Sequence, residues 1–350
     1  EVLHGALMST PHDPRKIDRY EAPNYLAKYR ERQGAKTAPP DDADGQDAST
    51  PLYLRRFRAR AASPEVPVIQ VDGESFTRDF AEASREKEIV APPSRKAAED
   101  FVAEIRIIRH GITQGYSTDA GLTPMGGWQA HQRGHSLSKS LKEGHKVRIV
   151  CADTNRARQT AEQIHRGMLD GLDQWQRKAE VSEPESIPEL RNFGVWTPDG
   201  LRDVTSAFRQ YQATMEKLER MAVGDRPRWL VEIDRFYRVQ LGGADPIHMW
   251  LTIPLMYFEP PALCVRRFWR GFHRLIAEGE DGQRIVAATH SGPIRAFATW
   301  AHGYDPGEPY NTEEVVVKVR RGGQTALVAY RNRVTEVNVP PPDEFPQWES

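Results

Sequence analysis

The chain has 350 residues, enough for one large domain or two modest ones, and 39% of them are hydrophobic. Its formal net charge is −1, which gives no indication of binding to nucleic acid or to an acidic membrane surface. We expect neither a membrane span nor a secretory signal, and the two cysteines, Cys151 and Cys264, are too far apart for a Cys-x-x-Cys pair. This cysteine usage argues against a disulfide framework and structural zinc, and it favours a reducing, cytoplasmic location.

Residues 1–100 differ in composition from the rest of the chain. They are rich in Pro, Asp, Arg and Ala with few apolar repeats, and the segment 36–50 is typical of a disordered linker. Four arginines cluster at 55–60, but the neutral whole chain favours a solvated or partner-packing arm over one that binds nucleic acid. We therefore expect a poorly structured N-terminal arm through which the chain could form a homo-oligomer, with no nucleic-acid or membrane partner.

From residue 104 onward, predicted strands alternate with predicted helices. Apolar strands are expected at 104–108, 147–151 and 284–289, and helices at 125–141, at about 156–169 and from 294 to a stop at Gly303. Residues 314–319 and 325–330 are predicted to form a hairpin. This alternation implies an α/β fold, a three-layer α/β/α sandwich with a mainly parallel sheet covered on both faces.

The middle of the chain is more helical. Apolar residues recur at spacings of three and four along 208–222 and 265–276, which predicts two amphipathic helices with core-facing stripes rather than cofactor contacts. We expect residues 196–262 to form a helical lid whose bulky side chains make a second small core. The main domain is then expected at 101–335 and a C-terminal tail at 336–350.

Three predicted strands lead into polar segments. These are Arg109-His110-Gly111, Asp153-Thr154-Asn155-Arg156 and His290-Ser291-Gly292. Because the carboxyl ends of parallel strands meet at one edge of an open sheet, we expect two histidines and two arginines to gather there. Arginine forks clamp phosphate oxygens, and a neutral imidazole is a competent nucleophile near pH 7. Glycines and a helix N-terminus let the backbone approach an anion, so the set suits a phosphoryl group.

Four segments carry these residues in order along the chain. They read IRIIRHGITQG at 105–115, GLTPMGGWQA at 121–130, VCADTNRARQTAEQI at 150–164 and VAATHSGPIRAF at 286–297. In this order, each after a predicted strand or helix signal, they resemble the histidine phosphatase superfamily, also called phosphoglycerate mutase-like. The resemblance covers about 104–335, leaves out the first hundred residues and is weak between 200 and 260.

The resemblance implies a role for each matching residue. His110 would attack phosphorus in line and carry the phosphoryl group, while Arg109, Arg156 and His290 would hold its oxygens and neutralise charge in the transition state. Further phosphate-binding residues would be Gly111, Thr113, Ser291 and Gly292. Neither a metal nor another cofactor is expected.

The superfamily also needs a carboxylic acid that protonates the leaving oxygen and then activates water. Its usual place is shortly before an aromatic-Gly-x-Trp-like segment, which here is 193–196. The nearest preceding acid is Glu189, but an ungapped alignment puts Leu190 at the family position, so a one-residue bulge would have to carry Glu189 inward. Asp199 and Asp245 are the alternatives.

The resulting expectation is a phosphomonoester hydrolase that forms a phosphohistidine on His110 and acts on a small-molecule phosphate ester. The alternatives are a phosphoglycerate-type mutase and a catalytically weak phosphate-binding or regulatory module. Mutases carry a glutamate-arginine-aromatic-Gly run and a longer basic substrate loop, whereas this chain has Leu-Arg-Asn-Phe-Gly at 190–194 and a short loop after Gly111. Both differences favour hydrolysis. Tyr116 replaces an asparagine common in the family, which indicates a changed substrate site.

Overall fold

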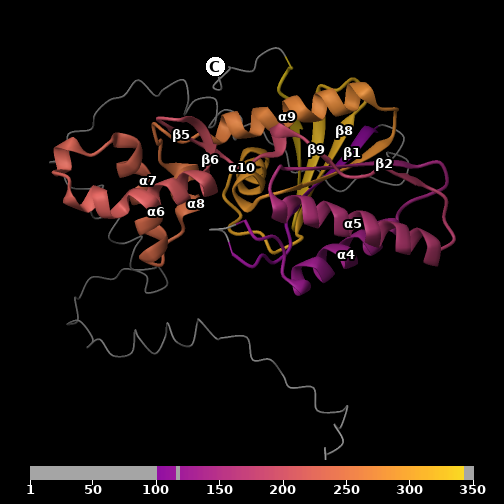
Figure 1. Cartoon of the computed structure of the whole chain (residues 1–350). Helices are drawn as coiled ribbons and strands as arrows, with labels where there is room; N and C mark the ends of the chain where they lie inside the picture. Colours follow the sequence, from indigo (N-terminus) through magenta and orange to yellow (C-terminus); the bar gives the residue numbers. More distant parts are fainter. Residues whose placement is uncertain (1–100, 116–118, 343–350) are drawn as a thin grey trace, which may run out of the picture. The chain divides into compact units, whose positions relative to one another are not determined.

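The computed structural model describes residues 101–115 and 119–342 (Figure 1). The expected N-terminal arm, Tyr116 and most of the expected C-terminal tail lie outside these residues. Within the described ranges no helix is both long enough and apolar enough to cross a membrane.

A single eight-stranded sheet forms the centre of the domain. The strand order is β10-β9-β8-β1-β7-β2-β3, and β4 also pairs with β2. The strands are β1 (Phe101–Arg109), β2 (Lys146–Cys151), β3 (Glu180–Val181), β4 (Glu185–Ser186), β7 (Gln283–Thr289), β8 (Glu314–Arg320), β9 (Thr325–Tyr330) and β10 (Arg333–Asn338). Strands β1, β7 and β2 run parallel with β3 and β4, whereas β1, β8, β9 and β10 pair antiparallel.

The predicted α/β sandwich is confirmed, with a mixed sheet in place of a mainly parallel one. The reason is the short connections 321–324 and 331–332, because a tight turn can join only antiparallel neighbours. Strand β10 also extends past residue 335, the expected end of the domain, and pairs with β9 along its full length.

Helices cover both faces of the sheet. Figure 1 shows α4 (Pro124–Ser138) and α5 (Asn155–Gln174) on one side and α9 (Pro261–Glu278) on the other, with α10 (Ser291–His302) packed against α9. This double cover explains why β1 buries Ile105, Ile107 and Ile108 completely. Gly303 adopts a left-handed φ of 76° and ends α10, as predicted.

Helices α4 and α5 touch backbone to backbone. A Cβ placed on Gly134 would lie 2.0 Å from the carbonyl oxygen of Ile164, and one on Gly167 would lie 2.0 Å from that of His131. No side chain fits at either position, so the two helices can approach this closely only because both residues are glycine.

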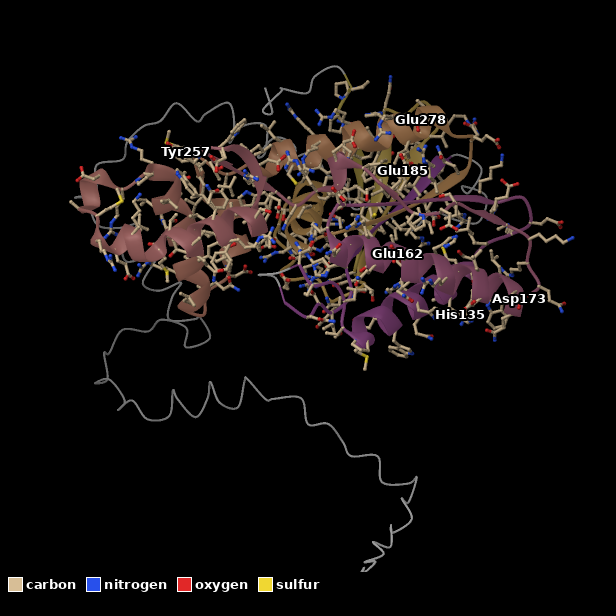
Figure 2. All side chains as sticks on the ribbon, in the orientation of Figure 1. His135, Glu162, Asp173, Glu185, Tyr257 and Glu278 are labelled. Atoms are coloured by element: carbon tan, nitrogen blue, oxygen red, sulfur yellow. The ribbon has the colours of Figure 1, made fainter. Side chains whose placement is uncertain are left out.

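Ion pairs at the edge of the sheet add little to the stability of the fold. Arg148 of β2 donates to Glu278 of α9 at 2.6 Å and to Glu185 of β4 at 3.0 Å, and Figure 2 shows these two carboxylates on the same side of the molecule. All three side chains are partly exposed, so each pair contributes at most about 1 kcal/mol.

The segment between β4 and α9, here called the insertion, spans 187–260 and contains most of the range 196–262 that is predicted as a helical lid. It contains η2 (Pro188–Leu190), β5 (Gly194–Thr197), β6 (Gly200–Asp203), α6 (Val204–Arg220), η3 (Val223–Asp225), α7 (Arg228–Leu241) and α8 (Pro246–Thr252). Its aromatic side chains pack together: the rings of Phe193 and Trp250 stack with centroids 4.1 Å apart, and Phe236 contacts Phe193 and Phe258. These residues are buried and belong to the same hydrophobic cluster as the sheet strands, so they extend the main core rather than forming the separate second core that the sequence predicts.

A buried ion pair fixes the start of this insertion to α9. Glu259 is 2% exposed, and its carboxylate accepts from Arg267 at 2.8 and 3.0 Å, from Arg191 at 2.9 Å and from the Gly194 amide at 3.0 Å. Burial alone would raise the pKa of Glu259, but the charges of Arg267 and Arg191 hold it below the ordinary value. Arg267 also donates to the carbonyl groups of 189, 191 and 192.

Candidate active site

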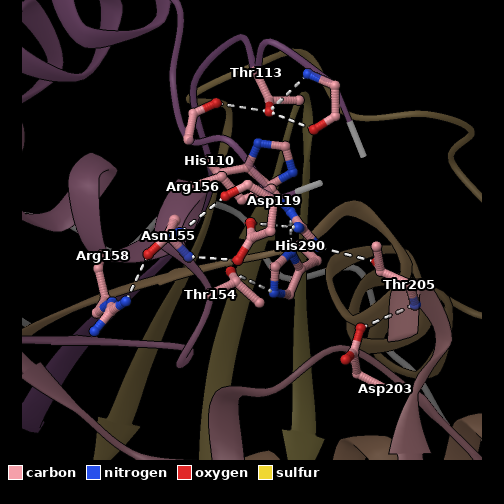
Figure 3. A network of polar contacts seen from close by, with 12 residues as sticks. His110, Thr113, Asp119, Thr154, Asn155, Arg156, Arg158, Asp203, Thr205 and His290 are labelled. Atoms are coloured by element: carbon pink, nitrogen blue, oxygen red, sulfur yellow. Dashed lines mark hydrogen bonds and ion pairs between the residues drawn. The ribbon is translucent and has the colours of Figure 1, made fainter. Parts of the chain in front are cut away.

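The carboxyl ends of β1, β7 and β2 bring three of the predicted residues together. Arg109 of β1 pairs with Thr289 of β7, so His110 and His290 follow at adjacent strand ends, with ring centroids 5.5 Å apart. Arg156 lies in the first turn of α5, after β2, and its Nε donates to His290 Nδ1 at 3.3 Å. The cluster of His110, Arg156 and His290 therefore follows from the parallel order of these strands (Figure 3).

His110 is buried, neutral and held in one tautomer. Its side chain is 2% exposed, and its Nδ1 lies 2.8 Å from the carbonyl oxygen of Gly111, where it can only donate. Burial lowers the pKa of His110, the Gly111 carbonyl raises it, and the charges of Arg156 and Arg109 lower it further, to about 3. The lone pair of the neutral ring is thus on Nε2, as a nucleophile requires.

The backbone around His110 is tied to its neighbours. The His110 amide donates to the Thr289 carbonyl at 2.9 Å, and the side chain of Asn311 donates to the His110 carbonyl at 3.0 Å. A Cβ on Gly111 would lie 2.4 Å from the Gly126 carbonyl oxygen, so glycine is needed here for the close approach of α4. Asn311 carries no motif, and the sequence analysis did not identify it.

His290 is also neutral. It is 2% exposed, and burial together with the charge of Arg156 places its pKa well below the ordinary value. Because Nδ1 accepts from Arg156, Nε2 carries the hydrogen, and it lies 3.5 Å from Thr154 Oγ1. His290 can therefore donate a hydrogen bond without carrying charge.

Arg156 joins three parts of the chain. Its side chain is 1% exposed, its Nη1 lies 2.9 Å from Asp119 Oδ1, and its Nη2 donates to Thr205 Oγ1 at 3.2 Å. Asp119 comes from the segment between the first two motifs, and Thr205 from the first turn of α6 in the insertion. The sequence analysis identified neither partner, and Figure 3 shows both contacts.

The family comparison matches this part of the chain. Residues 105–220 match the histidine phosphatase superfamily (branch 1), a range that includes His110 and Arg156. This segment of the chain is thus histidine phosphatase-like. A comparison with curated proteins gives no match.

Several solved structures are similar to this chain. Phosphoglycerate mutase from Bacillus anthracis is 15% identical over 67% of this chain and 93% of its own, with a TM-score of 0.37. Mycobacterial glucosyl-3-phosphoglycerate phosphatase is 18% identical over 63% and 92%, with a TM-score of 0.36. A phosphoserine phosphatase from Entamoeba histolytica is 16% identical over 65% and 95%, with a TM-score of 0.34.

Arg109, the arginine of the superfamily's first motif, is held by a neighbouring loop. Its guanidinium pairs with Glu308 Oε1 at 2.8 Å and donates to the Pro309 carbonyl, while its Nε is buried with no hydrogen-bond partner among the described residues. Both site arginines are thus paired with carboxylates of this chain, and Arg109 keeps one unsatisfied donor.

Two of the predicted phosphate-binding residues, Thr113 and Gly292, have other contacts in the structure, whereas Ser291 lies at a helix N-terminus. The Thr113 hydroxyl donates to the Gly121 carbonyl at 2.8 Å, so it holds its own loop together. A Cβ on Gly292 would lie 2.6 Å from the Phe193 ring, so this glycine makes room for the insertion. Ser291 begins α10 directly after His290, at the helix N-terminus where backbone amides can face an anion.

Glu189 does not join the cluster. Residues 188–190 form the 3₁₀ turn η2 rather than an inward bulge, and the Glu189 carboxylate lies 3.1 Å from Arg274 of α9. Its Cβ packs against Gly271 of the same helix. The structure therefore does not support the prediction of Glu189 as the acid, because the Glu189 side chain packs against α9.

The two alternative acids lie elsewhere as well. Asp199 is exposed in the β5–β6 turn and accepts from Gln210 at 2.8 Å. Asp245 caps α8 and pairs with Arg295 at 2.7 Å. Among the described residues, neither carboxylate contacts His110, Arg156 or His290.

The described residues contain no candidate metal site. They contain no group of three or more His, Cys, Asp or Glu side chains arranged to hold a metal ion. Both cysteines are unpaired and buried.

The buried neutral state of His110 predicts a pH-dependent stability. Between pH 7 and pH 5 the unfolded chain takes up a proton on this histidine and the folded chain does not, because the folded pKa is about 3. Unfolding free energy therefore falls as the pH falls, and His110 alone contributes about 2 kcal/mol of that loss. Urea unfolding of the wild type and His110→Asn at both pH values measures it. Equal losses in the two proteins would contradict the prediction.

Proposed function

We propose that the protein is a phosphomonoester hydrolase that works through a phosphohistidine on His110. The observation that carries the proposal is the buried, neutral His110 ring with Nδ1 held at 2.8 Å by the Gly111 carbonyl, next to the 1% exposed guanidinium of Arg156. Nε2 would attack phosphorus as the bond to the leaving oxygen breaks. Water would then attack the phosphohistidine, release phosphate and restore His110.

The surroundings of His110 suit a transferring phosphoryl group. Arg156 would bind the equatorial oxygens, and Arg109 has a buried Nε with no partner in the described part of the chain. His290 would donate from Nε2 while neutral, so it adds a hydrogen bond without raising the charge. The N-terminus of α10 adds a favourable field for the anion.

Hydrolysis is favoured over transfer to a second hydroxyl. Arg191, the arginine of the 190–194 run, is held by the buried carboxylate of Glu259 and serves the packing of the insertion. A mutase would return the phosphoryl group to the organic product. Incubation with 3-phosphoglycerate separates the two activities, since a hydrolase releases inorganic phosphate and a mutase forms 2-phosphoglycerate.

The intermediate itself can be trapped. A rapid mix with ³²P-labelled aryl phosphate, quenched in alkali where phosphohistidine is stable, should label the protein with up to one phosphoryl group per chain. Phosphate release without any labelled protein would contradict the covalent route. Phosphate binding without release would favour the regulatory alternative.

Arg156 should respond strongly to a conservative change. Lysine keeps the charge but loses the planar fork that bonds Asp119, His290 and Thr205 at once, so Arg156→Lys should lower kcat/KM for an aryl phosphate on the order of 10²-fold or more. Arg158→Lys is the matched control, because that side chain is half exposed and contacts Asn155 and Asp153 at the protein surface. Similar losses in both variants would argue against a phosphate-binding role for Arg156.

A further inference from the structure

We propose that Asp119 is the proton donor and acceptor of this site. The inference rests on the proposed function, for which no acid among Glu189, Asp199 and Asp245 reaches the cluster. Asp119 reaches it: its Oδ1 lies 2.9 Å from Arg156 Nη1, and the same guanidinium contacts His290. Figure 3 shows Asp119 linked to Arg156 beside both histidines.

The backbone holds Asp119 in this position. Its φ of 48° is left-handed, a conformation that aspartate adopts more readily than most residues. Its Oδ2 accepts from the Asn155 amide at 2.9 Å, and its carbonyl accepts from the Asn155 side chain at 2.9 Å. The Asp119 carboxylate is therefore held by Asn155, the first residue of α5, which directly precedes Arg156.

Binding of a phosphate ester would change the surroundings of this carboxylate. The phosphoryl oxygens and Asp119 compete for the same guanidinium, so two anionic groups meet at Arg156. In the proposed mechanism, a proton that enters with the ester or from solvent resides on Asp119 during the first step. The side chain is 21% exposed, so exchange with water is open. Substrate binding would thus place a protonated carboxyl next to the leaving oxygen.

The two chemical steps then balance. In the first, His110 Nε2 forms the bond to phosphorus, the bond from phosphorus to the leaving oxygen breaks, and the Asp119 proton moves to that oxygen. In the second, the Asp119 carboxylate takes a proton from water as the water oxygen bonds phosphorus and the N–P bond breaks. Phosphate leaves, and both side chains return to their starting states.

Two simpler roles for Asp119 make different predictions. A purely structural cap of α5 would affect every substrate equally when removed. A carboxylate that merely occupies the phosphate position would inhibit, so its removal would lower KM and speed turnover for all esters. Removal of a proton donor instead slows most the esters whose leaving oxygen must be protonated before it can depart.

Asp119→Asn separates these roles, because asparagine keeps the volume and can still accept from the Asn155 amide. Single-turnover phosphorylation of His110 is measured with p-nitrophenyl phosphate and with ethyl phosphate. We expect a loss on the order of 10²-fold or more for ethyl phosphate and less than about 10-fold for the aryl ester, whose leaving group needs no proton. The variant should also accumulate phosphohistidine, because its second step lacks a base.

Glu189→Gln, Asp199→Asn and Asp245→Asn are the matched controls and should keep both phosphorylation rates. Equal losses for the two esters, faster turnover of both, or a selective ethyl phosphate loss in one of the controls would each overturn the role of Asp119. The proposed function fails separately, if the wild type forms no phosphohistidine. Labelled enzyme together with equal ester losses in Asp119→Asn would leave the function intact and refute only this inference.

Discussion

Replacing His110 with asparagine is expected to lower kcat/KM for an aryl phosphate on the order of 10⁴-fold or more. Asparagine keeps a side chain of similar reach toward the Gly111 carbonyl, but its amide nitrogen lone pair is delocalised and it offers no nucleophile like the imidazole Nε2. The phosphoenzyme should disappear together with turnover. Steady-state phosphate release and the alkaline-quench labelling measure both effects in the same protein.

His165→Asn is the matched control for this experiment. His165 is another buried histidine, on α5, but its nearest charged partner is Glu183 at 3.7 Å, outside the cluster. This variant should label and turn over like the wild type. If His110→Asn retained turnover near that of the control, another group would carry the phosphoryl transfer and the proposed function would be wrong.

Glu259→Gln is expected to lower the free energy of unfolding by about 3–5 kcal/mol. The amide cannot balance the charge of Arg267, which is buried and would keep its contacts with the carbonyl groups of 189–192. An uncompensated buried charge is far more costly than the loss of an exposed pair. Urea unfolding followed by tryptophan fluorescence measures the difference.

Glu278→Gln is the control for this loss. Glu278 also pairs with arginines, Arg148 at 2.6 Å and Arg274 at 3.7 Å, but it is about half exposed. Its removal should leave the free energy of unfolding nearly unchanged, because water screens these exposed pairs. Comparable destabilisation by both substitutions would show that burial of the Glu259 carboxylate is not what stabilises this region.

The stability of that ion pair bears on the site through Phe193. Arg267 and Glu259 fix the segment 189–194, and the Phe193 ring packs against Gly292 in the first turn of α10. That turn follows His290 directly. We therefore infer that the insertion contributes to the position of His290 without touching the reacting atoms.

The sequence predicts the cluster of His110, Arg156 and His290, because two simple rules are enough to place these residues together. Each residue ends or follows an apolar strand, and parallel strands place their carboxyl ends at one edge. The hairpin β8–β9 was predictable for a similar reason, since Gly322 and Gly323 both adopt positive φ in its turn. Local pattern and short-range geometry decide these features.

The acid could not be predicted in the same way. Glu189 fits the family spacing within one residue, but whether 188–190 turns inward or forms η2 depends on Gly271 and Arg274, which lie some eighty residues later. Asp119 carries no motif, and only the folded chain brings it to Arg156. Glu259 likewise appears as an ordinary charged residue until α9 surrounds it with arginines.

The glycine contacts between α4 and α5 have a mechanical consequence for the site. Helix α4 starts against Gly111, beside His110, and α5 carries Arg156 in its first turn. Backbone contact at Gly134 and Gly167 leaves no side chain between the two helices that could yield. The nucleophile and its arginine are therefore mounted on one stiff body. Two other side-chain partners of Arg156, Asp119 and Thr205 in the first turn of α6, come from outside this body.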